Sequence, residues 1–180
     1  LVIKQFDKES KLNILDLGTG SGVIGITLSK LYPNSIITIS DISSKALNVA
    51  NKNIKNHNVT NIRSLESDWF DNFKEKELFD LILTNPPYIS KDDVHLNNLE
   101  LGYEPSNALV SANDGFADIF KIIDTSPKFL NSGGLLIIEH GHSQGNRVKN
   151  YFQHRSFDNI KQHQDINQKI RVTSASKIKV

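Results

Sequence analysis

Three places in the sequence carry side chains that can hold a ligand, and two of them also contain glycines or prolines that shape the backbone. They are the glycine-rich run Asp-Leu-Gly-Thr-Gly-Ser-Gly-Val-Ile-Gly at 16–25, the carboxylate of Asp41, and Asn-Pro-Pro-Tyr at 85–88. Each one follows a run of strand-forming apolar residues. Because open α/β sheets bind ligands beyond the carboxyl ends of their strands, we expect the three stretches to form one site.

The glycine-rich run is typical of a turn that brings the backbone close to a nucleotide. Residues 20–25 fit the pattern G-x-G-x-x-G, which dinucleotide-binding proteins share with ordinary tight strand–helix turns. Asp41 follows about twenty residues later, where a carboxylate accepts both hydroxyls of a ribose. The combination indicates a ligand that contains adenosine, NAD included. The alternative for Asp41 is a cap on the helix that follows it.

Two acidic positions favour S-adenosylmethionine over NAD. Asp16 lies in the glycine-rich run, where it orders the loop or approaches the positive end of the methionine moiety, and it would be unfavourable beside a pyrophosphate. Asp68 follows the third strand and is placed to accept from the adenine amine, while Trp69 or Phe70 covers the ring face. The alternative for Trp69 is a plain position in the core.

The Asn-Pro-Pro-Tyr stretch fits transfer of a methyl group to a planar NH₂ group. An amide or aromatic amine nitrogen is a poor nucleophile, because its lone pair is delocalised. Two acceptors that hold its N–H groups orient the nitrogen and stabilise the positive charge that develops on it. We expect these acceptors to be the Asn85 side-chain carbonyl and the Pro86 backbone carbonyl, in a backbone stiffened by Pro86 and Pro87. Tyr88 offers a flat face to the substrate group. The alternative is an ordinary Pro-Pro turn.

Alternating strand and helix patterns surround these stretches. Strands are expected over 12–17, 35–41, 61–67, 79–85, 134–141, 159–164 and 170–178, and helices over 21–33, 43–58, 115–134 and 143–156. Pro127 should kink or interrupt the third helix, which is expected to end at the Gly133-Gly134 pair. The pattern predicts an α/β fold with a mostly parallel sheet and helices on both faces. The long polar segment 89–113 is expected to be a functional loop.

The composition excludes several classes of protein. The chain has 180 residues, which fits one domain, and it has no cysteine, which excludes disulfides, cysteine-based zinc sites and thiol nucleophiles. Its net charge of +1 argues against nucleic acid as the direct substrate. No apolar run is long enough to span a membrane. His140 and His142 flank a strand end beside Glu139, but no third ligand is evident, so we expect no metal. The first residue is not Met, and we expect the chain to be a fragment.

In this order, the motifs resemble the class I S-adenosylmethionine-dependent methyltransferases, which have a Rossmann-like seven-stranded sheet and modify adenine, cytosine or glutamine NH₂ groups. Three longer stretches are similar to the release factor glutamine methyltransferase family (HemK/PrmC). These are Thr-Asn-Pro-Pro-Tyr-Ile at 84–89, the segment that contains Tyr-Glu-Pro at 103–119, and Leu-Leu-Ile-Ile-Glu-His-Gly-His-Ser-Gln-Gly at 135–145. The resemblance covers nearly the whole chain.

The resemblance implies a cytoplasmic enzyme that takes S-adenosylmethionine as its cofactor and methylates the glutamine of the Gly-Gly-Gln motif in class I peptide chain release factors. The catalytic residues would be Asn85, Pro86 and Tyr88. Substrate binding would involve Asn85, Pro86, Pro87, Tyr88 and Glu104. The residues that would contact the cofactor are Asp16, Gly18, Thr19, Gly20, Gly22, Asp41, Ile42, Asp68, Trp69 and Asn85. The alternatives are a ribosomal protein glutamine methyltransferase, a DNA or RNA adenine-N6 methyltransferase, an NAD-dependent dehydrogenase and a nucleotide sensor.

Two departures from the family pattern are visible. The family carries an N-terminal helical domain that helps to bind the release factor, and a segment like Pro-Glu-Thr-Glu before the first strand. Neither is present, so residues 1–180 are expected to be the catalytic domain alone. Near the end of the chain, Asp-Ile-Asn-Gln-Lys-Ile-Arg at 165–171 keeps the aspartate and arginine of the family pattern Asp-x-x-Gly-x-x-Arg but lacks its glycine. That turn is therefore expected to differ.

Overall fold

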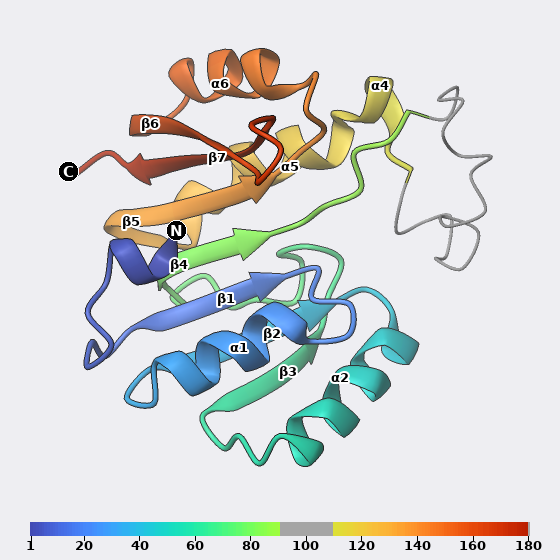
Figure 1. Cartoon of the computed structure of the whole chain (residues 1–180), viewed down its shortest axis with the longest axis vertical. Helices are drawn as coiled ribbons and strands as arrows, with labels where there is room; N and C mark the ends of the chain where they lie inside the picture. Colours follow the sequence, from blue (N-terminus) through green and yellow to red (C-terminus); the bar gives the residue numbers. More distant parts are fainter. Residues whose placement is uncertain (91–109, 180) are drawn as a thin grey trace.

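A computed structural model of the chain describes residues 1–90 and 110–179. Within these residues, seven strands form one sheet in the order β3-β2-β1-β4-β5-β7-β6 (Figure 1). The first five strands run parallel and β7 runs antiparallel to both of its neighbours. The strands are β1 (Asn13–Leu17), β2 (Ile36–Asp41), β3 (Ile62–Glu66), β4 (Phe79–Thr84), β5 (Leu130–Glu139), β6 (Phe157–Gln164) and β7 (Ile170–Lys177). The prediction of a mostly parallel seven-stranded α/β sheet is confirmed.

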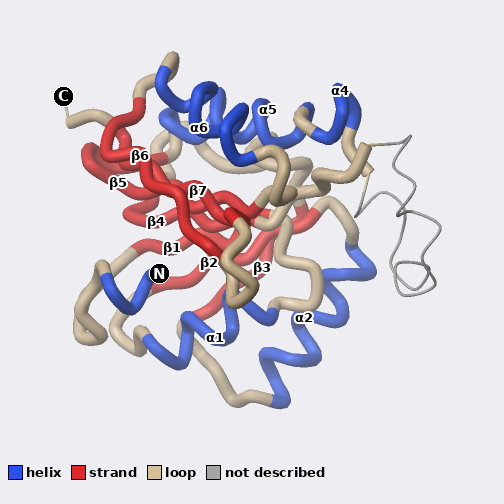
Figure 2. The backbone as a smooth tube through the Cα atoms, turned by 45° about the horizontal axis from the view of Figure 1, so that its top comes forward, coloured by secondary structure: helices blue, strands red, loops and turns tan. Residues whose placement is uncertain are grey.

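Helices cover both faces of the sheet (Figure 2). On one face lie α1 (Val23–Leu31) and α2 (Ser44–Asn56), and on the other lie α5 (Ala117–Thr125) and α6 (Gly145–Gln153). The short helical elements are η1 (Val2–Lys4), α4 (Ala112–Gly115) and η4 (Ser126–Lys128). Among the helices of the described residues, none has the length and apolar character needed to cross a membrane.

Alternation along the central strands builds two hydrophobic cores. Successive side chains of a strand point to opposite faces, so neighbours in sequence enter different cores. Ile14 and Leu81 pack with Leu28 and Tyr32 on the α1–α2 face. Leu15 and Ile82 join the cluster that contains the α5 and α6 residues Ile119, Ile122, Val148 and Phe152. Because helices cover both faces, the central strands β1 and β4 consist mainly of buried apolar residues.

The predicted helix over 115–134 is wrong in its second half. Helix α5 ends at Thr125, and Pro127 lies in the following 3₁₀ turn, so the predicted interruption at Pro127 is confirmed. Strand β5 begins at Leu130, which is buried and pairs with Phe79 of β4. The Gly133-Gly134 pair therefore lies inside β5, where the register shifts between the two strands and Gly133 has a φ of +77°. A glycine pair is compatible with the end of a helix and with a bend in a strand. Here the strand forms because it buries Leu130 beside Phe79.

The turn between β6 and β7 forms without the glycine of the family pattern. The Asp165 side chain accepts from the backbone N–H groups of Asn167 and Lys169 at 2.8 and 3.0 Å. The Asp165 N–H donates to the Lys169 carbonyl at 2.8 Å. Gln168, which occupies the position of that glycine, has a φ of 59°. The turn thus forces a residue with a side chain into the left-handed region.

Candidate active site

The parallel strands β1, β2 and β4 end at the same edge of the sheet (Figure 1), where the candidate residues predicted from the sequence follow them. The chain builds outward from β1 through β2 to β3 and then returns to β4 on the other side of β1, and sheets of this kind bind ligands at such a reversal. Leu17 pairs with Ser40 of β2 and with Thr84 of β4. Gly18, Asp41 and Asn85 come directly after Leu17, Ser40 and Thr84. They therefore lie side by side at the ends of neighbouring strands.

The glycine-rich run forms the tight strand–helix turn between β1 and α1. Gly18, Gly20 and Gly22 have φ values of +75°, +57° and +85°, a region that glycine adopts without steric cost. At Gly20, a Cβ would meet no atom within 4 Å, so this glycine borders open space. Gly25 has a different role, because a Cβ there would lie 2.3 Å from the Ile39 side chain. It allows α1 to pack closely on β2.

Asp16 holds this turn from beneath. Its carboxylate is buried and accepts from the Thr19 hydroxyl at 2.6 Å and from the Gly25 backbone N–H at 2.8 Å. Of the two roles considered for Asp16, these bonds are those of a residue that orders the loop. Burial raises the pKa of the Asp16 carboxyl to about 6, although the two hydrogen bonds oppose the shift.

Asp41 links the glycine turn to the start of α2. One of its carboxylate oxygens accepts from the Gly20 N–H at 2.9 Å, and the other accepts from the Ser43 N–H at 2.9 Å. The N-terminal cap of α2 is Ser43, whose hydroxyl accepts from Ala46, so capping is not the role of Asp41. Each carboxylate oxygen has a second lone pair, which leaves Asp41 able to accept two hydroxyl groups as well. The next residue, Ile42, is 61% exposed and provides an apolar surface at the same edge.

The segment after β3 packs against both the glycine turn and α5. A Cβ on Gly18 would lie 3.2 Å from the Trp69 ring, which also packs partly into the core below α5. The Trp69 indole N–H donates to Asp118 at 3.0 Å. The exposed carboxylate of Asp68 pairs with Lys121 at 3.1 Å. Trp69 therefore borders the site and the core together, while Phe70 is wholly a core residue.

Asn85 and Tyr88 differ in how the protein holds them. Asn85 is exposed at the end of β4, and no hydrogen bond joins its amide to another described residue. Pro86 is buried, and every peptide bond in the described chain is trans. Tyr88 is half-buried, and its hydroxyl accepts from the Arg171 guanidinium at 3.1 Å and donates to Glu139. The tyrosine is fixed, whereas the asparagine amide is available to a ligand.

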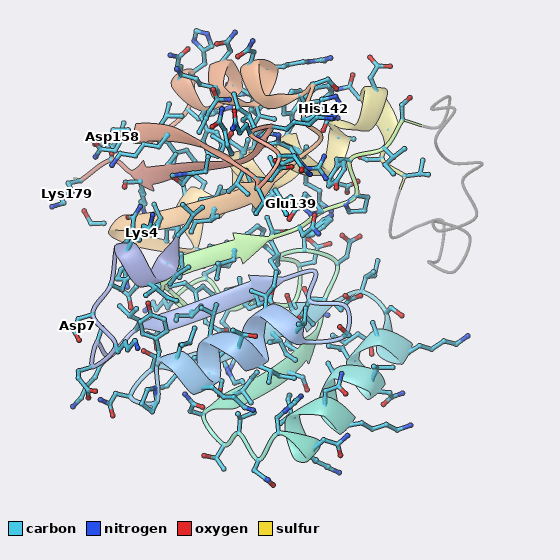
Figure 3. All side chains as sticks on the ribbon, viewed as in Figure 1. Lys4, Asp7, Glu139, His142, Asp158 and Lys179 are labelled. Carbon is cyan, nitrogen blue, oxygen red and sulfur yellow. The ribbon has the colours of Figure 1, made fainter. Side chains whose placement is uncertain are left out.

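Burial sets the electrostatics of the Tyr88 cluster. It raises the pKa of the Tyr88 hydroxyl and that of the Glu139 carboxyl, and Arg171 opposes both shifts. In Figure 3 the Glu139 side chain lies at the end toward which the strands point, far from Lys4 and Asp158. Arg171 thus favours the ionised form of the Glu139 carboxyl beside the Tyr88 hydroxyl, near the strand ends.

The two histidines beyond β5 do not form a pair. His140 is fully buried, and its Nδ1–H donates to the Gly141 carbonyl at 2.9 Å while Nε2 accepts from the Thr173 hydroxyl at 2.8 Å. Burial lowers the pKa of His140, which favours this neutral form. His142 is exposed (Figure 3). Among the described residues, no three His, Cys, Asp or Glu side chains are grouped as metal ligands.

Some residues at this edge were not predicted from the sequence. Asp118 and Lys121 hold the segment after β3, and Gln144 contacts the turn after β4. Asp118 and Lys121 are three residues apart on α5, a spacing that places them on one face and is the only local signal for their shared role. The predicted substrate residue Glu104 lies outside the described residues.

The sheet order and the strand-end loops define the class I methyltransferase fold. A methyltransferase from Pyrococcus furiosus superposes with a TM-score of 0.72 at 16% identity, over 99% of this chain and 80% of that protein. A Thermus thermophilus 16S rRNA N2 G1207 methyltransferase superposes with a TM-score of 0.70 at 16% identity, over 97% of this chain and 40% of that protein. The model of the methyltransferase small domain family matches residues 1–101, more than half of the chain, and the chain belongs to this family.

Curated relatives are more similar to this chain in sequence than these two structures are. The release factor glutamine methyltransferase of Francisella tularensis is 39% identical over 169 residues, which cover 94% of this chain and 59% of that protein. The protein of the same name from Escherichia coli K12 is 38% identical over 165 residues, which cover 92% of this chain and 59% of that protein. The chain thus spans about three fifths of the length of these relatives.

Proposed function

We propose that this chain is the methyl-transferring domain of a release factor glutamine methyltransferase. It would transfer a methyl group from S-adenosylmethionine to the side-chain amide nitrogen of a glutamine, namely that of the Gly-Gly-Gln motif in a class I peptide chain release factor. The observation that carries the proposal is the placement of Asn85. Its exposed amide stands at the end of β4, directly beside the glycine turn that follows β1.

The residues around the glycine turn suit the adenosine part of this cofactor. Gly20 borders open space, so the backbone can be approached closely from that side. Asp41 is adjacent and can accept the two ribose hydroxyls with its remaining lone pairs. Ile42 and the Trp69 ring supply apolar surfaces for a flat base. Acidic side chains at this edge favour a ligand with a positive charge over a pyrophosphate.

Asn85 and Pro86 supply the acceptors that the reaction requires. When bound, the cofactor supplies a methyl carbon attached to a positively charged sulfur. The Asn85 side-chain oxygen would accept from one N–H of the glutamine amide and the Pro86 carbonyl from the other. The amide nitrogen forms the new N–C bond while the C–S bond breaks and leaves its electron pair on sulfur; the nitrogen then loses one proton to water. The two acceptors orient the nitrogen and stabilise the positive charge that develops on it.

The relatives support the choice of substrate. Those that match most of this chain at 38–39% identity are named for the release factor and its glutamine. The match covers 59% of the length of each of these relatives, and we propose that residues 1–180 are the catalytic part. Because release factors act on ribosomes, we place the protein in the cytoplasm.

The proposal is tested by transfer of radiolabelled methyl from S-adenosylmethionine to three acceptors. These are a class I release factor, the same factor with its Gly-Gly-Gln glutamine changed to alanine, and duplex DNA. Label on the first alone is the expected result. Label on DNA would assign the chain to the adenine methyltransferases instead. Equal label on both release factors would reject the glutamine as the acceptor.

A further inference from the structure

We propose that Gln144 is a positioning residue for methyl transfer. Its side-chain amide fixes the Tyr88 backbone carbonyl and thereby the Asn85–Tyr88 turn that carries both substrate acceptors. The inference rests on the proposed function, because it assigns Gln144 to the same site. Gln144 lies at the start of α6, 56 residues from Tyr88 in sequence.

The Gln144 amide bridges three segments of the chain. Its Nε2 donates to the Tyr88 carbonyl at 3.0 Å and faces the carbonyls of Asp114 and Gly115 at 3.4 and 3.5 Å. Its Oε1 accepts from the Gly141 N–H at 2.8 Å. Only this orientation is possible, because a flipped amide would place its oxygen against three carbonyl oxygens and its NH₂ against an N–H. Gln144 as a whole residue is only 8% exposed, so water does not replace these bonds freely.

The segment opposite Tyr88 is held in a costly conformation. Asn113, Asp114 and Gly115 have consecutive φ values of 54°, 56° and 84°, all in the left-handed region. Asn and Asp adopt this region more readily than other residues with a side chain, but three consecutive residues there persist only where their surroundings hold them. The backbone of Gly115 comes so close to Tyr88 that a Cβ would lie 2.2 Å from the Tyr88 carbonyl oxygen. The Tyr88 carbonyl is therefore confined between Gly115 and Gln144.

Fixing the Tyr88 carbonyl also fixes the acceptors before it. Thr84 pairs with Leu17 and Ile138, which anchors the turn at its upstream end. Pro86 and Pro87 each have a restricted φ, so few conformations connect Thr84 to an anchored Tyr88. The Pro86 carbonyl and the Asn85 side chain consequently have a defined place. The hydroxyl end of Tyr88 is held separately, by Arg171 and Glu139.

The sharpest test is Gln144→Glu, which keeps the shape and the oxygen toward Gly141 but turns the donor into an acceptor. At about pH 8 the new carboxylate at position 144 should repel the Tyr88 carbonyl. The resulting displacement of the Asn85–Tyr88 turn should lower kcat by about tenfold to a hundredfold. The Kd for S-adenosylmethionine should stay within about twofold, because Gln144 does not touch the glycine turn. Near about pH 6, the buried carboxyl regains a proton and donates again, so kcat should recover toward that of the wild type.

Two further variants control this test. Gln153→Glu adds the same carboxylate at the exposed end of α6 and should leave kcat unchanged. Gln144→Ala removes the donor without adding charge and should lower kcat at every pH, which keeps the test decisive where Gln144→Glu fails to fold. All variants keep the charged and titratable groups around this part of the site, so a comparison between variants at one pH isolates position 144; the groups are Asp114, Glu139, His140, Arg147 and Arg171.

Failure of the inference and failure of the proposed function give different results. A wild type that methylates the release factor, together with a Gln144→Ala variant of unchanged kcat, would overturn the role of Gln144 alone. An equal loss of cofactor affinity and kcat would also overturn it, since Gln144 would then support the fold in general. A wild type that labels no release factor would reject the proposed function and the inference with it. Thermal melting of each variant identifies losses that come from unfolding.

Discussion

The Asp41 carboxylate accepts a hydrogen bond from the Gly20 backbone N–H at 2.9 Å, so the end of β2 holds the glycine turn that follows β1. The other oxygen of the same carboxylate accepts from Ser43 at the start of α2. Asp41 therefore connects the end of β2 both with the glycine turn after β1 and with the start of α2. Asn85 stands beyond the third strand end and makes no such bond to the described residues. Replacement of Asp41 should accordingly affect cofactor binding, and replacement of Asn85 should affect methyl transfer.

Asp41→Ala should weaken binding of the cofactor. A hydrogen bond from a ribose hydroxyl to the carboxylate contributes about 1.5–3 kcal/mol to the free energy of binding. Its loss should raise the Kd for S-adenosylmethionine about tenfold or more. Isothermal titration calorimetry measures this Kd directly. Asp158→Ala, at the far end of the molecule in Figure 3, removes a carboxylate away from the site and serves as the control. An unchanged Kd for Asp41→Ala would remove Asp41 from the cofactor site.

Binding should also change the fluorescence of Trp69, which is the only tryptophan in the sequence. The ring borders Gly18 at the glycine turn, so an adenine placed there alters the surroundings of the indole. Titration with S-adenosylhomocysteine should quench the emission and reach saturation, whereas NAD should have no effect. Trp69→Phe provides the blank. Constant emission during binding that calorimetry detects would leave Trp69 as a core residue only.

Asp16 should make stability depend on pH. Its carboxyl titrates at about 6 in the folded protein and at 3.8 when it is unperturbed, so between these values the folded state binds more protons than the unfolded state. The stabilisation associated with the bound proton is fully present below the lower value and is lost as the pH rises through the higher one. The free energy of unfolding should thus fall by about 3 kcal/mol across this window, at about 1.4 kcal/mol per pKa unit.

Urea unfolding of the wild type and of Asp16→Asn, measured at several pH values, isolates this effect. The Glu139 carboxyl, whose pKa is also raised, titrates in both proteins and cancels. The difference between the two free energies of unfolding should shrink or reverse as the pH rises through the window. Parallel pH curves for the two proteins would show that the Asp16 carboxyl titrates normally.

Gln168→Gly should stabilise the protein. Gln168 has a φ of 59° in the turn before β7, and glycine adopts this conformation without a clash of Cβ. Removal of that strain should raise the free energy of unfolding by about 0.5–1 kcal/mol. Gln162→Gly, the same substitution inside β6, should lower it, because glycine in a strand interior adds only flexibility. Destabilisation by both substitutions would mean that the turn carries no strain at Gln168.

The parts of the site that the sequence predicted are those with local signals. The glycine turn, Asp41 and the Asn85 turn each follow an apolar strand, and the parallel sheet then places them side by side. Gln144 could not be predicted, because its contact with Tyr88 spans 56 residues and depends on where α6 begins. The start of β5 was missed since the Gly133-Gly134 pair is equally compatible with a helix end and with a bent strand.

Removal of the Asn85 amide should greatly slow methyl transfer and leave cofactor binding nearly unchanged. Without one acceptor for the substrate N–H groups, Asn85→Ala should lose about a hundredfold to a thousandfold in kcat, which is typical for a transition-state hydrogen bond. The Kd for S-adenosylmethionine should change by less than about twofold. Asn48→Ala, an exposed position on α2, is the matched control. Equal losses of cofactor affinity in Asn85→Ala and Asp41→Ala would end this division of roles.

The most direct measurement is the location of the methyl group after a single turnover. A class I release factor would be incubated with S-adenosylmethionine and either the wild type or Asn85→Ala, and its peptides would be sequenced by tandem mass spectrometry. The account predicts one methyl group on the side-chain amide nitrogen of the Gly-Gly-Gln glutamine with the wild type, and an unmodified peptide with Asn85→Ala. A methyl group at any other atom, or equal modification by both proteins, would contradict it.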